Sequence, residues 1–291
     1  MNAQTLEVQT LLHVKNVVYA TDLSFAAERA LPFAHEIARR YGATLHVVHA
    51  IQPDVSAFVP PLEWPRMIEE GNIFRQESMT ELDLRLGDVR HELIFRPGNV
   101  LKVLSEELAK TSSDLLVMST HGRTGLRKAL VGSIAEKMFR HTTCPVLTVG
   151  PRVAAEPRNT GELNRILYAT DFSAESLAAA PFAISLAQEH RARLILLHCI
   201  GDSGASVEDM RQALADLVPC GTELFEEPEC IVARSTATNK ILSVAEEQGV
   251  DLIILGIHGT KEPQTETSLS RHPGVLRIVA EAKCPVLTVR A

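Results

Sequence analysis

The 291-residue chain has few aromatic residues and no excess of basic charge. Phe, Trp and Tyr make up 4% of it, which leaves little aromatic surface on which the bases of single-stranded nucleic acid could stack. The net charge is -7, whereas proteins that hold nucleic acid through its phosphates usually carry a basic face. The sequence therefore predicts no nucleic-acid partner.

Long apolar runs and paired cysteines are also missing. No segment is apolar over the length of a transmembrane helix, and Glu7, His13 and Lys15 interrupt the N-terminal region where a signal peptide would be apolar. The five cysteines show no CxxC spacing, and the histidines show no HxH or HExxH spacing. We expect a reduced cytoplasmic protein with structural thiols, no membrane association and no zinc motif. A zinc site assembled by the fold stays open.

What the sequence does contain is an internal repeat. Residues 16–24, NVVYATDLS, reappear at 165–173 as RILYATDFS, and CPVLTV at 144–149 reappears at 284–289. Self-similarity in the same order along the chain indicates two copies of one folding unit. We expect domain one at residues 1–150 and domain two at 163–291. The polar segment 151–162, with two prolines and one glycine, is the expected linker.

Within copy one, short apolar runs alternate with helical patterns. The expected strands are 17–20, 44–50, 91–95, 115–118 and 145–149, and the expected helices include 24–41, 63–86 and 99–110. Ser24 is the expected N-cap of the first helix. Strands this apolar, alternating with helices, predict a parallel sheet that is covered on both faces. The predicted fold class is α/β, with two doubly wound, Rossmann-like, five-stranded sandwiches related by the repeat.

The segment 114–149 has the pattern of a phosphate-holding loop. The apolar run 115–118 leads into a turn-rich stretch, STHGRTG, and Gly132-Ser133 then precedes an amphipathic helix. Glycine lets the backbone approach an anion, and a helix start offers free N–H groups and the positive end of a dipole. The spacing is not that of the P-loop, because no Gly-Lys-Ser/Thr stands at the required distance.

These motifs together resemble the universal stress protein family, over residues 16–149 and again over 165–289. The resemblance rests on a first strand ending in Ala-Thr-Asp-x-Ser, a histidine ending the second strand, a Gly-x2-Gly-x9-Gly-Ser motif and a closing Cys-Pro-Val-Leu-x-Val strand. It implies an adenine nucleotide alpha hydrolase-like fold. It also implies a homodimer or, in a tandem chain, an intramolecular pseudo-dimer.

For copy one the resemblance implies an ATP site, with Mg²⁺ on the phosphates. Asp22 and the backbone at Ala50 would hold the adenosine end, and Gly132-Ser133 would hold the phosphates. Ser119 stands where the motif has its first glycine, and we expect it to narrow the space for the ligand. The candidate residues are Ala20, Thr21, Asp22, Ala50, Ser119, His121, Gly122, Arg123, Gly132, Ser133 and Ile134.

Copy two keeps Asp171 but departs from the motif near its end. Counted back from the closing strand, the positions of Gly132 and Ser133 fall at His272 and Pro273. Proline cannot donate an N–H to phosphate. We therefore expect that copy two does not bind ATP in the manner of the family.

Several of these residues have a simpler structural explanation. Asp22 and Asp171 each precede a predicted helix, where a side-chain cap or turn would use them. His49 and His198 end apolar runs and are expected to be hydrogen-bonded core residues. Cys144 and Cys284 are expected to pack as small apolar groups.

The sequence contains no recognisable nucleophile with a paired base, so we expect no enzyme activity beyond slow ATP hydrolysis. The leading hypothesis is a stress-response protein in which ATP regulates domain one and domain two is structural or regulatory, with unidentified protein partners. The alternatives are a protein–protein stress scaffold that binds no nucleotide, or a binder of another ligand, such as zinc or a metabolite, in domain two.

Overall fold

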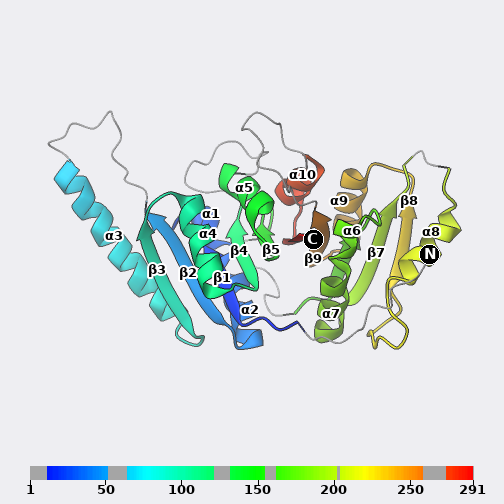
Figure 1. The fold of residues 1–291 in the computed structure, drawn as a ribbon, viewed down its shortest axis with the longest axis horizontal. Helices are drawn as coiled ribbons and strands as arrows, with labels where there is room; N and C mark the ends of the chain where they lie inside the picture. Colours follow the sequence, from blue (N-terminus) through cyan, green and yellow to red (C-terminus); the bar gives the residue numbers. More distant parts are fainter. Residues whose placement is uncertain are drawn as a thin grey trace.

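The computed structural model describes residues 12–51, 64–120, 132–154, 162–201, 204–257 and 273–290. Ten strands in these residues form one sheet, in the order β3-β2-β1-β4-β5-β10-β9-β6-β7-β8 (Figure 1). Copy one contributes β1 Asn16–Ala20, β2 Thr44–Ile51, β3 His91–Pro97, β4 Leu115–Ser119 and β5 Val146–Val149. Copy two contributes β6 Arg165–Ala169, β7 Arg193–Cys199, β8 Glu229–Ala233, β9 Leu252–Ile257 and β10 Val286–Arg290.

Helices connect the strands in both copies. Those of copy one are α1 Phe25–Glu28, α2 Leu31–Tyr41, α3 Trp64–Arg85, α4 Val100–Thr111 and α5 Ser133–His141. Those of copy two are α6 Ala174–Leu177, α7 Ala180–His190, α8 Val207–Ala215, α9 Ala237–Glu247 and α10 Pro273–Glu281. The middle helix of copy two, α8, is much shorter than its counterpart α3, which accounts for the shorter spacing between matched motifs there.

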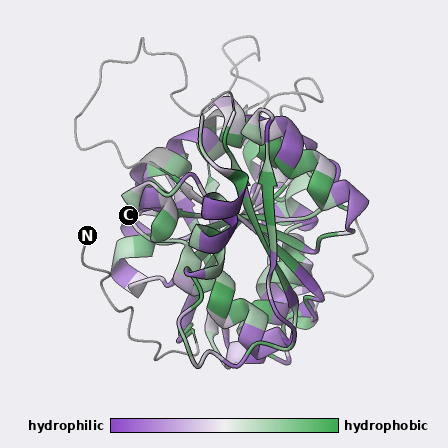
Figure 2. Ribbon diagram, turned by 90° about the vertical axis from the view of Figure 1, so that its right-hand side faces the viewer, coloured by the Kyte–Doolittle hydropathy of each residue, from purple (hydrophilic) through white to green (hydrophobic). Residues whose placement is uncertain are grey.

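Both faces of the sheet are buried. Along β4, Val117 belongs to the core that α2 and α3 cover, while its neighbour Leu116 belongs to the core under α4 and α5. Alternate residues of a strand point to opposite faces, so near-continuous apolar strands are what this burial requires. Figure 2 shows largely hydrophobic strands between helices with hydrophilic residues on their outer sides. The predicted doubly wound α/β fold is confirmed.

The two halves meet at the centre of the sheet, where β5 and β10 pair antiparallel while all other pairs are parallel. The buried Thr148 Oγ1 donates to Val286 O at 3.0 Å, and Thr288 Oγ1 donates to Val146 O at 3.2 Å. The two bonds are reciprocal, as expected of two similar units facing each other across a pseudo-two-fold axis. The two copies thus form one continuous sheet rather than separate sandwiches.

A second contact between the halves joins α2 to α7. Arg40 Nη2 donates to Glu189 O at 2.8 Å, and the Glu189 carboxylate accepts from Tyr41 Oη and, at 2.7 Å, from Leu12 N. Burial, with the positive charge of Arg40, lowers the pKa of the neighbouring His190 to about 4. The ring is therefore neutral at pH 7 and its Nδ1 accepts from Leu163 N at 3.2 Å.

The expected continuous helix over 24–41 was wrong. Ser24 Oγ caps α1 as predicted, accepting from Ala27 N at 3.2 Å, but α1 ends at Glu28 and α2 begins at Leu31. Pro32 lies in the first turn of α2, where its missing N–H costs no helical hydrogen bond. The same break recurs between α6 and α7, with a proline again in the first turn of α7.

Candidate functional site

The carboxyl ends of β1, β2 and β4 lie side by side in copy one, because β1 pairs with β2 on one side and β4 on the other. The chain runs from β1 to β2 and β3 on one side of β1 and then crosses to β4 and β5 on the other side. This reversal of strand order between β1 and β4 is the switch point, where ligands of doubly wound sheets bind. Ala20, Ala50 and Ser119 all lie at this edge. His121, Gly122 and Arg123 lie outside the described residues.

The turn after β1 is held by its own side chains. Thr21 Oγ1 accepts from Leu23 N at 3.0 Å, and Asp22 Oδ1 accepts from Ser24 N at 3.0 Å. These bonds hold Leu23 in the left-handed region at φ 61°, an uncommon conformation for a branched residue. Asp22 thus has a structural role in the turn, as the simpler explanation predicts, whatever else its carboxylate contacts.

Copy two builds the same turn. Asp171 Oδ1 accepts from Ser173 N at 2.9 Å and from Ser173 Oγ at 2.6 Å, and Phe172 again has φ 61°. Partial burial opposes ionisation of Asp171, but hydrogen bonds from Ser173 and Ser176 hold its pKa below the ordinary value. Because the turn is common to both copies, it does not by itself distinguish a nucleotide site.

In each copy, the histidine at the end of the second strand forms a hydrogen bond with the main chain of this turn. His49 is buried, and its Nδ1 lies 3.0 Å from Thr21 O. His198 Nδ1 lies 2.8 Å from Thr170 O in the same way. A carbonyl oxygen only accepts, so Nδ1 carries the proton in both rings. Both histidines are hydrogen-bonded as predicted, but only His49 is a buried core residue, and His198 is half-buried.

On the phosphate side, Gly132 brings the start of α5 against the end of β4. Gly132 N donates to Thr120 O at 2.8 Å, and a β-carbon on Gly132 would lie 2.8 Å from that same oxygen. Only glycine permits this approach without displacing backbone. Thr120 is a partner that the sequence did not indicate, because the contact is made by a main-chain atom.

The first turn of α5 has no side-chain cap. Gly132 is its N-cap, with extended backbone at φ -61° and ψ 146°, and it makes no capping hydrogen bond. By contrast, Asn99, Ser173 and Ser206 cap α4, α6 and α8 with side-chain oxygens. The leading N–H groups of a helix have no intrahelical acceptor, so those of Ser133 and Ile134 are available to an anion.

Ser119 points to the other face of the sheet. It alternates with Met118, which belongs to the core beneath α5, and so shares the face of Val117, where α1 contacts β4. Its counterpart Gly256 shows what that face holds in copy two: a β-carbon there would lie 2.3 Å from Glu175 O of α6. This geometry gives no support to the expectation that Ser119 narrows the space for the phosphates. The side chain of Ser119 instead limits how closely α1 can approach β4.

The corresponding helix of copy two begins with a different residue. Helix α10 spans Pro273–Glu281, in register with α5 at Ser133–His141, so Pro273 occupies the place of Ser133. Proline is well suited to the first turn but has no N–H to offer a phosphate. His272 lies outside the described residues.

No group of three or more His, Cys, Asp or Glu in the described residues could hold a metal ion. No helix in the same parts of the chain has both the length and the apolar character to cross a membrane.

The cysteines differ strongly in exposure, which makes their reactivity predictable. Cys220 is exposed, whereas burial raises the pKa of Cys144 to about 11 and that of Cys284 to about 12. The thiolate is the reactive form, so at pH 8 we expect a thiol reagent to modify Cys220 first in the native protein. Cys220→Ser should remove the fast phase and Cys284→Ser should leave it. A fast phase that persists in Cys220→Ser contradicts this prediction.

Comparison with known proteins gives the family. A model of the universal stress protein family matches residues 13–150 and 162–290, and the chain belongs to that family. A universal stress protein of Methanocaldococcus jannaschii is 31% identical over 140 residues, covering 46% of this chain and 81% of its own length. Universal stress protein A homolog 1 of Coxiella burnetii is 34% identical over 142 residues, covering 47% and 97%. Each matches about half of the chain, the length of one copy.

Among solved structures, a universal stress protein of Archaeoglobus fulgidus aligns with 96% of this chain and 99% of its own, with a TM-score of 0.73 and 18% identity. At that identity the likeness concerns the fold alone. The family includes nucleotide-binding members. One universal stress protein was solved in complex with cAMP, and it aligns with 47% of this chain and 98% of its own, with a TM-score of 0.34 and 24% identity.

Proposed function

We propose that domain one, residues 1–150, binds ATP with Mg²⁺ as a regulatory ligand, and that domain two, residues 163–291, is structural or regulatory. The observation that carries the proposal is the uncapped start of α5, held by Gly132 against β4 at the switch point of copy one. Copy two begins the matching helix with Pro273. This difference supports the proposal that the helix start of copy one, and not that of copy two, would hold phosphate.

In this proposal, different residues would contact the phosphates and the adenosine end of ATP. The N–H groups of Ser133 and Ile134 would hold phosphate oxygens, with the helix dipole adding favourable charge. The backbone at Ala50 and the carboxylate of Asp22 would hold the adenosine end, next to Ala20 and Thr21. His121, Gly122 and Arg123 belong to the segment that would cover the phosphates.

Mg²⁺ fits this arrangement as a phosphate-bound ion. The described residues hold no cluster of carboxylates for it, and Mg²⁺ in nucleotide sites is commonly bound largely by phosphate oxygens and water. When bound, it would neutralise charge on the triphosphate. Because the sequence contains no recognisable base that would position a water molecule, ATP acts as a ligand in this proposal and at most is hydrolysed slowly.

The direct test is whether the protein carries or binds nucleotide. Protein purified without added nucleotide is denatured, the supernatant is chromatographed for adenine compounds, and stripped protein is titrated with MgATP by calorimetry. One bound nucleotide per chain supports the proposal. Absence of both retained nucleotide and titration heat leaves the protein–protein scaffold as the better hypothesis, with zinc analysis of the same sample testing a metal-binding domain two. Cytoplasmic location belongs to the same proposal.

The acid after β1 allows a matched pair of variants. In Asp22→Asn the side-chain oxygen that accepts from Ser24 N is kept and only the charge is lost. We expect ATP to bind about ten-fold more weakly, because a hydrogen bond to a charged group is worth about 1.5–3 kcal/mol. Asp171→Asn changes the equivalent turn of copy two and should leave ATP affinity unchanged. Equal effects of the two variants in calorimetry would argue against an adenosine contact at Asp22.

A further inference from the structure

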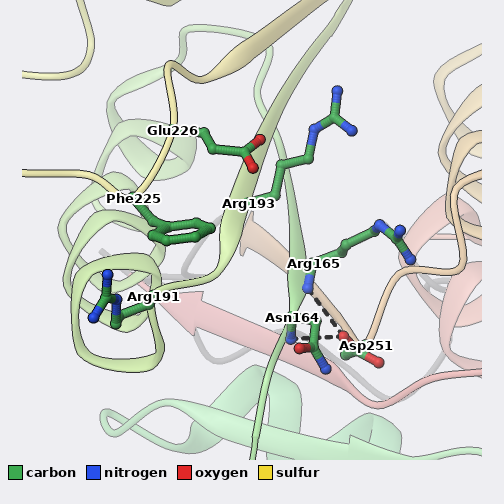
Figure 3. Close-up of a pocket in the computed structure, with 7 residues that line it drawn as sticks. All are labelled: Asn164, Arg165, Arg191, Arg193, Phe225, Glu226 and Asp251. Carbon is green, nitrogen blue, oxygen red and sulfur yellow. Dashed lines mark hydrogen bonds between the residues drawn. The ribbon is translucent and has the colours of Figure 1, made fainter.

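Copy two has a cavity at the edge of the sheet opposite to the switch points. Its volume is about 370 Å³. It lies where β6, β7 and β9 begin, whereas the turns after β1 and β6 that the two copies share lie where strands end. The residues around it are Asn164, Arg165, Arg191, Arg193, Phe225, Glu226 and Asp251 (Figure 3).

Two of the arginines are direct neighbours across strands. Arg165 and Arg193 are register partners in the parallel pair β6–β7, and Figure 3 shows both side chains beside the cavity, with that of Arg193 running upward and that of Arg165 to the right. Like charges at such positions are unfavourable unless something neutralises them. Arg193 Nη2 donates to Glu229 Oε2 at 2.8 Å, but Arg165 makes no side-chain hydrogen bond or ion pair with the part of the chain that the structure describes.

A third arginine comes from an unusual backbone position. Arg191 ends α7 in the left-handed conformation, with φ 54° and ψ 37°, where the equivalent residue after α2 is Gly42 with φ 61°. Side chains are unfavourable there and glycine is not. The Arg191 guanidinium carbon lies 5.1 Å from the centre of the Phe225 ring, which adds a cation–π contact on the other side of the cavity.

The fold does not require these arginines, as copy one shows. Asp251 Oδ2 accepts from Asn164 N at 2.8 Å and Arg165 N at 2.9 Å, and Asp114 Oδ2 accepts from Lys15 N and Asn16 N in the same way. The acid and its bonds are thus structural in both copies. The register pair that corresponds to Arg165 and Arg193 is Asn16 and Thr44, which is neutral.

We propose that this cavity binds a small ligand through its phosphate group. Neighbouring strands are about 4.8 Å apart, so two guanidinium groups on them can each donate to different oxygens of one phosphate. Arg193 keeps further N–H donors beside its bond to Glu229, and Arg165 keeps all of its own, so phosphate, which has more acceptor oxygens and more charge than a carboxylate, suits the pair better. Glu226 also lines the cavity, and with Asp251 and the Glu229 carboxylate on Arg193 three acids balance the three arginines. The proposed recognition therefore rests on the directed N–H donors of Arg165 and Arg193 and not on an excess of positive charge.

The test uses inorganic pyrophosphate as the probe, titrated into the full chain by calorimetry at fixed ionic strength. In the variant Arg165→Asn/Arg193→Thr, each arginine is replaced by the residue that stands at the matching position of copy one. The same fold already accommodates that pair of residues in copy one. We expect saturable binding to the natural chain and binding weakened about ten-fold or more in this variant. Arg66→Gln, an exposed arginine of α3 paired with Glu70, is the control and should bind as the natural chain does.

Two further arms identify the ligand class. Equal binding of inorganic phosphate and pyrophosphate indicates a site for one phosphate group, and preference for pyrophosphate indicates linked phosphates; either supports the proposal. Tighter binding of citrate than of both overturns the phosphate assignment. Absence of saturable binding by any probe, or unchanged pyrophosphate affinity in the double variant, overturns the site.

The site is independent of the proposed ATP site, and the experiment separates them. Pyrophosphate could also contact the start of α5, so the titration is repeated in Gly132→Val. Heat that disappears there but remains in the double variant assigns the binding to α5 and refutes the arginine cavity. Heat that remains in Gly132→Val and disappears in the double variant supports the cavity, including in the case where ATP does not bind at all.

Discussion

Replacing Gly256 with serine, the residue that copy one carries at this position, is expected to destabilise the protein by about 3 kcal/mol. A β-carbon on Gly256 would lie 2.3 Å from Glu175 O and 2.3 Å from Ser176 Cα. Both are main-chain atoms at the start of α6, so relief requires the helix to move rather than a side chain to turn. Because α6 packs on β9 beside the fully buried core, such a shift opens contacts around Ile254 and Tyr168.

Urea unfolding followed by circular dichroism measures this effect. Gly204→Ser is the control, because a β-carbon there meets nothing within 4 Å. The reverse change, Ser119→Gly, should alter stability by no more than about 1 kcal/mol, since it removes a small side chain from a strand end. If Gly256→Ser unfolds at the same urea concentration as Gly204→Ser, the tight approach of α6 to β9 is not a constraint on the sequence.

The pair Ser119 and Gly256 also shows where motif reading falls short. A spacing such as Gly-x2-Gly-x9-Gly-Ser specifies which residues are small, but it does not say which face of the sheet each small residue serves. The alternation of side chains along β4 puts Ser119 opposite to the core under α5. The two glycines thus relieve different contacts: Gly256 admits α6, and Gly132 admits Thr120 O.

The fold was predictable because two independent signals agreed. Apolar runs such as 115–118 require burial on both faces of a sheet. Because of the internal repeat, each strand or helix predicted in copy one could also be checked against the matching segment of copy two. What the repeat could not predict was the junction. Thr148 and Thr288 donate to carbonyl oxygens of the partner strand, but nothing in the sequences of β5 and β10 marks these two strands as partners of each other. Pro32 was a signal for the break before α2. The apolar residues keep helical spacing on both sides of Pro32, however, so a single continuous helix was predicted.

The arginine cavity was missed for a different reason. Arg165 and Arg193 are far apart in sequence and become neighbours only through the β6–β7 register. The signal was present in the repeat itself, as charged residues in copy two where copy one has Asn16, Gly42 and Thr44. Comparing the copies for what they share identifies the fold. Comparing them for what they do not share identifies residues that the fold leaves free for another use.

Loss of ATP binding in Gly132→Val is the second large effect that we expect. The valine β-carbon would lie 2.8 Å from Thr120 O, so the start of α5 must move away from β4 and its N–H groups leave the switch point. Calorimetry with MgATP should show no saturable binding, a loss of roughly a hundred-fold or more if several phosphate hydrogen bonds fail together. Gly204→Val, in open space, should bind as the natural chain does.

Because Gly132→Val also strains the fold, Ser133→Pro gives a second and cleaner measure. Proline is favourable in the first turn of a helix, and Gly132 already has the extended backbone, φ -61° and ψ 146°, that a residue before proline adopts. The change imports Pro273 of copy two, removing one N–H and one hydroxyl without disturbing α5. We expect unchanged thermal unfolding and ATP affinity about ten-fold or more weaker. Full ATP affinity in a folded Ser133→Pro protein would mean that the phosphates do not lie on this helix start, and the difference between the two copies would then need another cause.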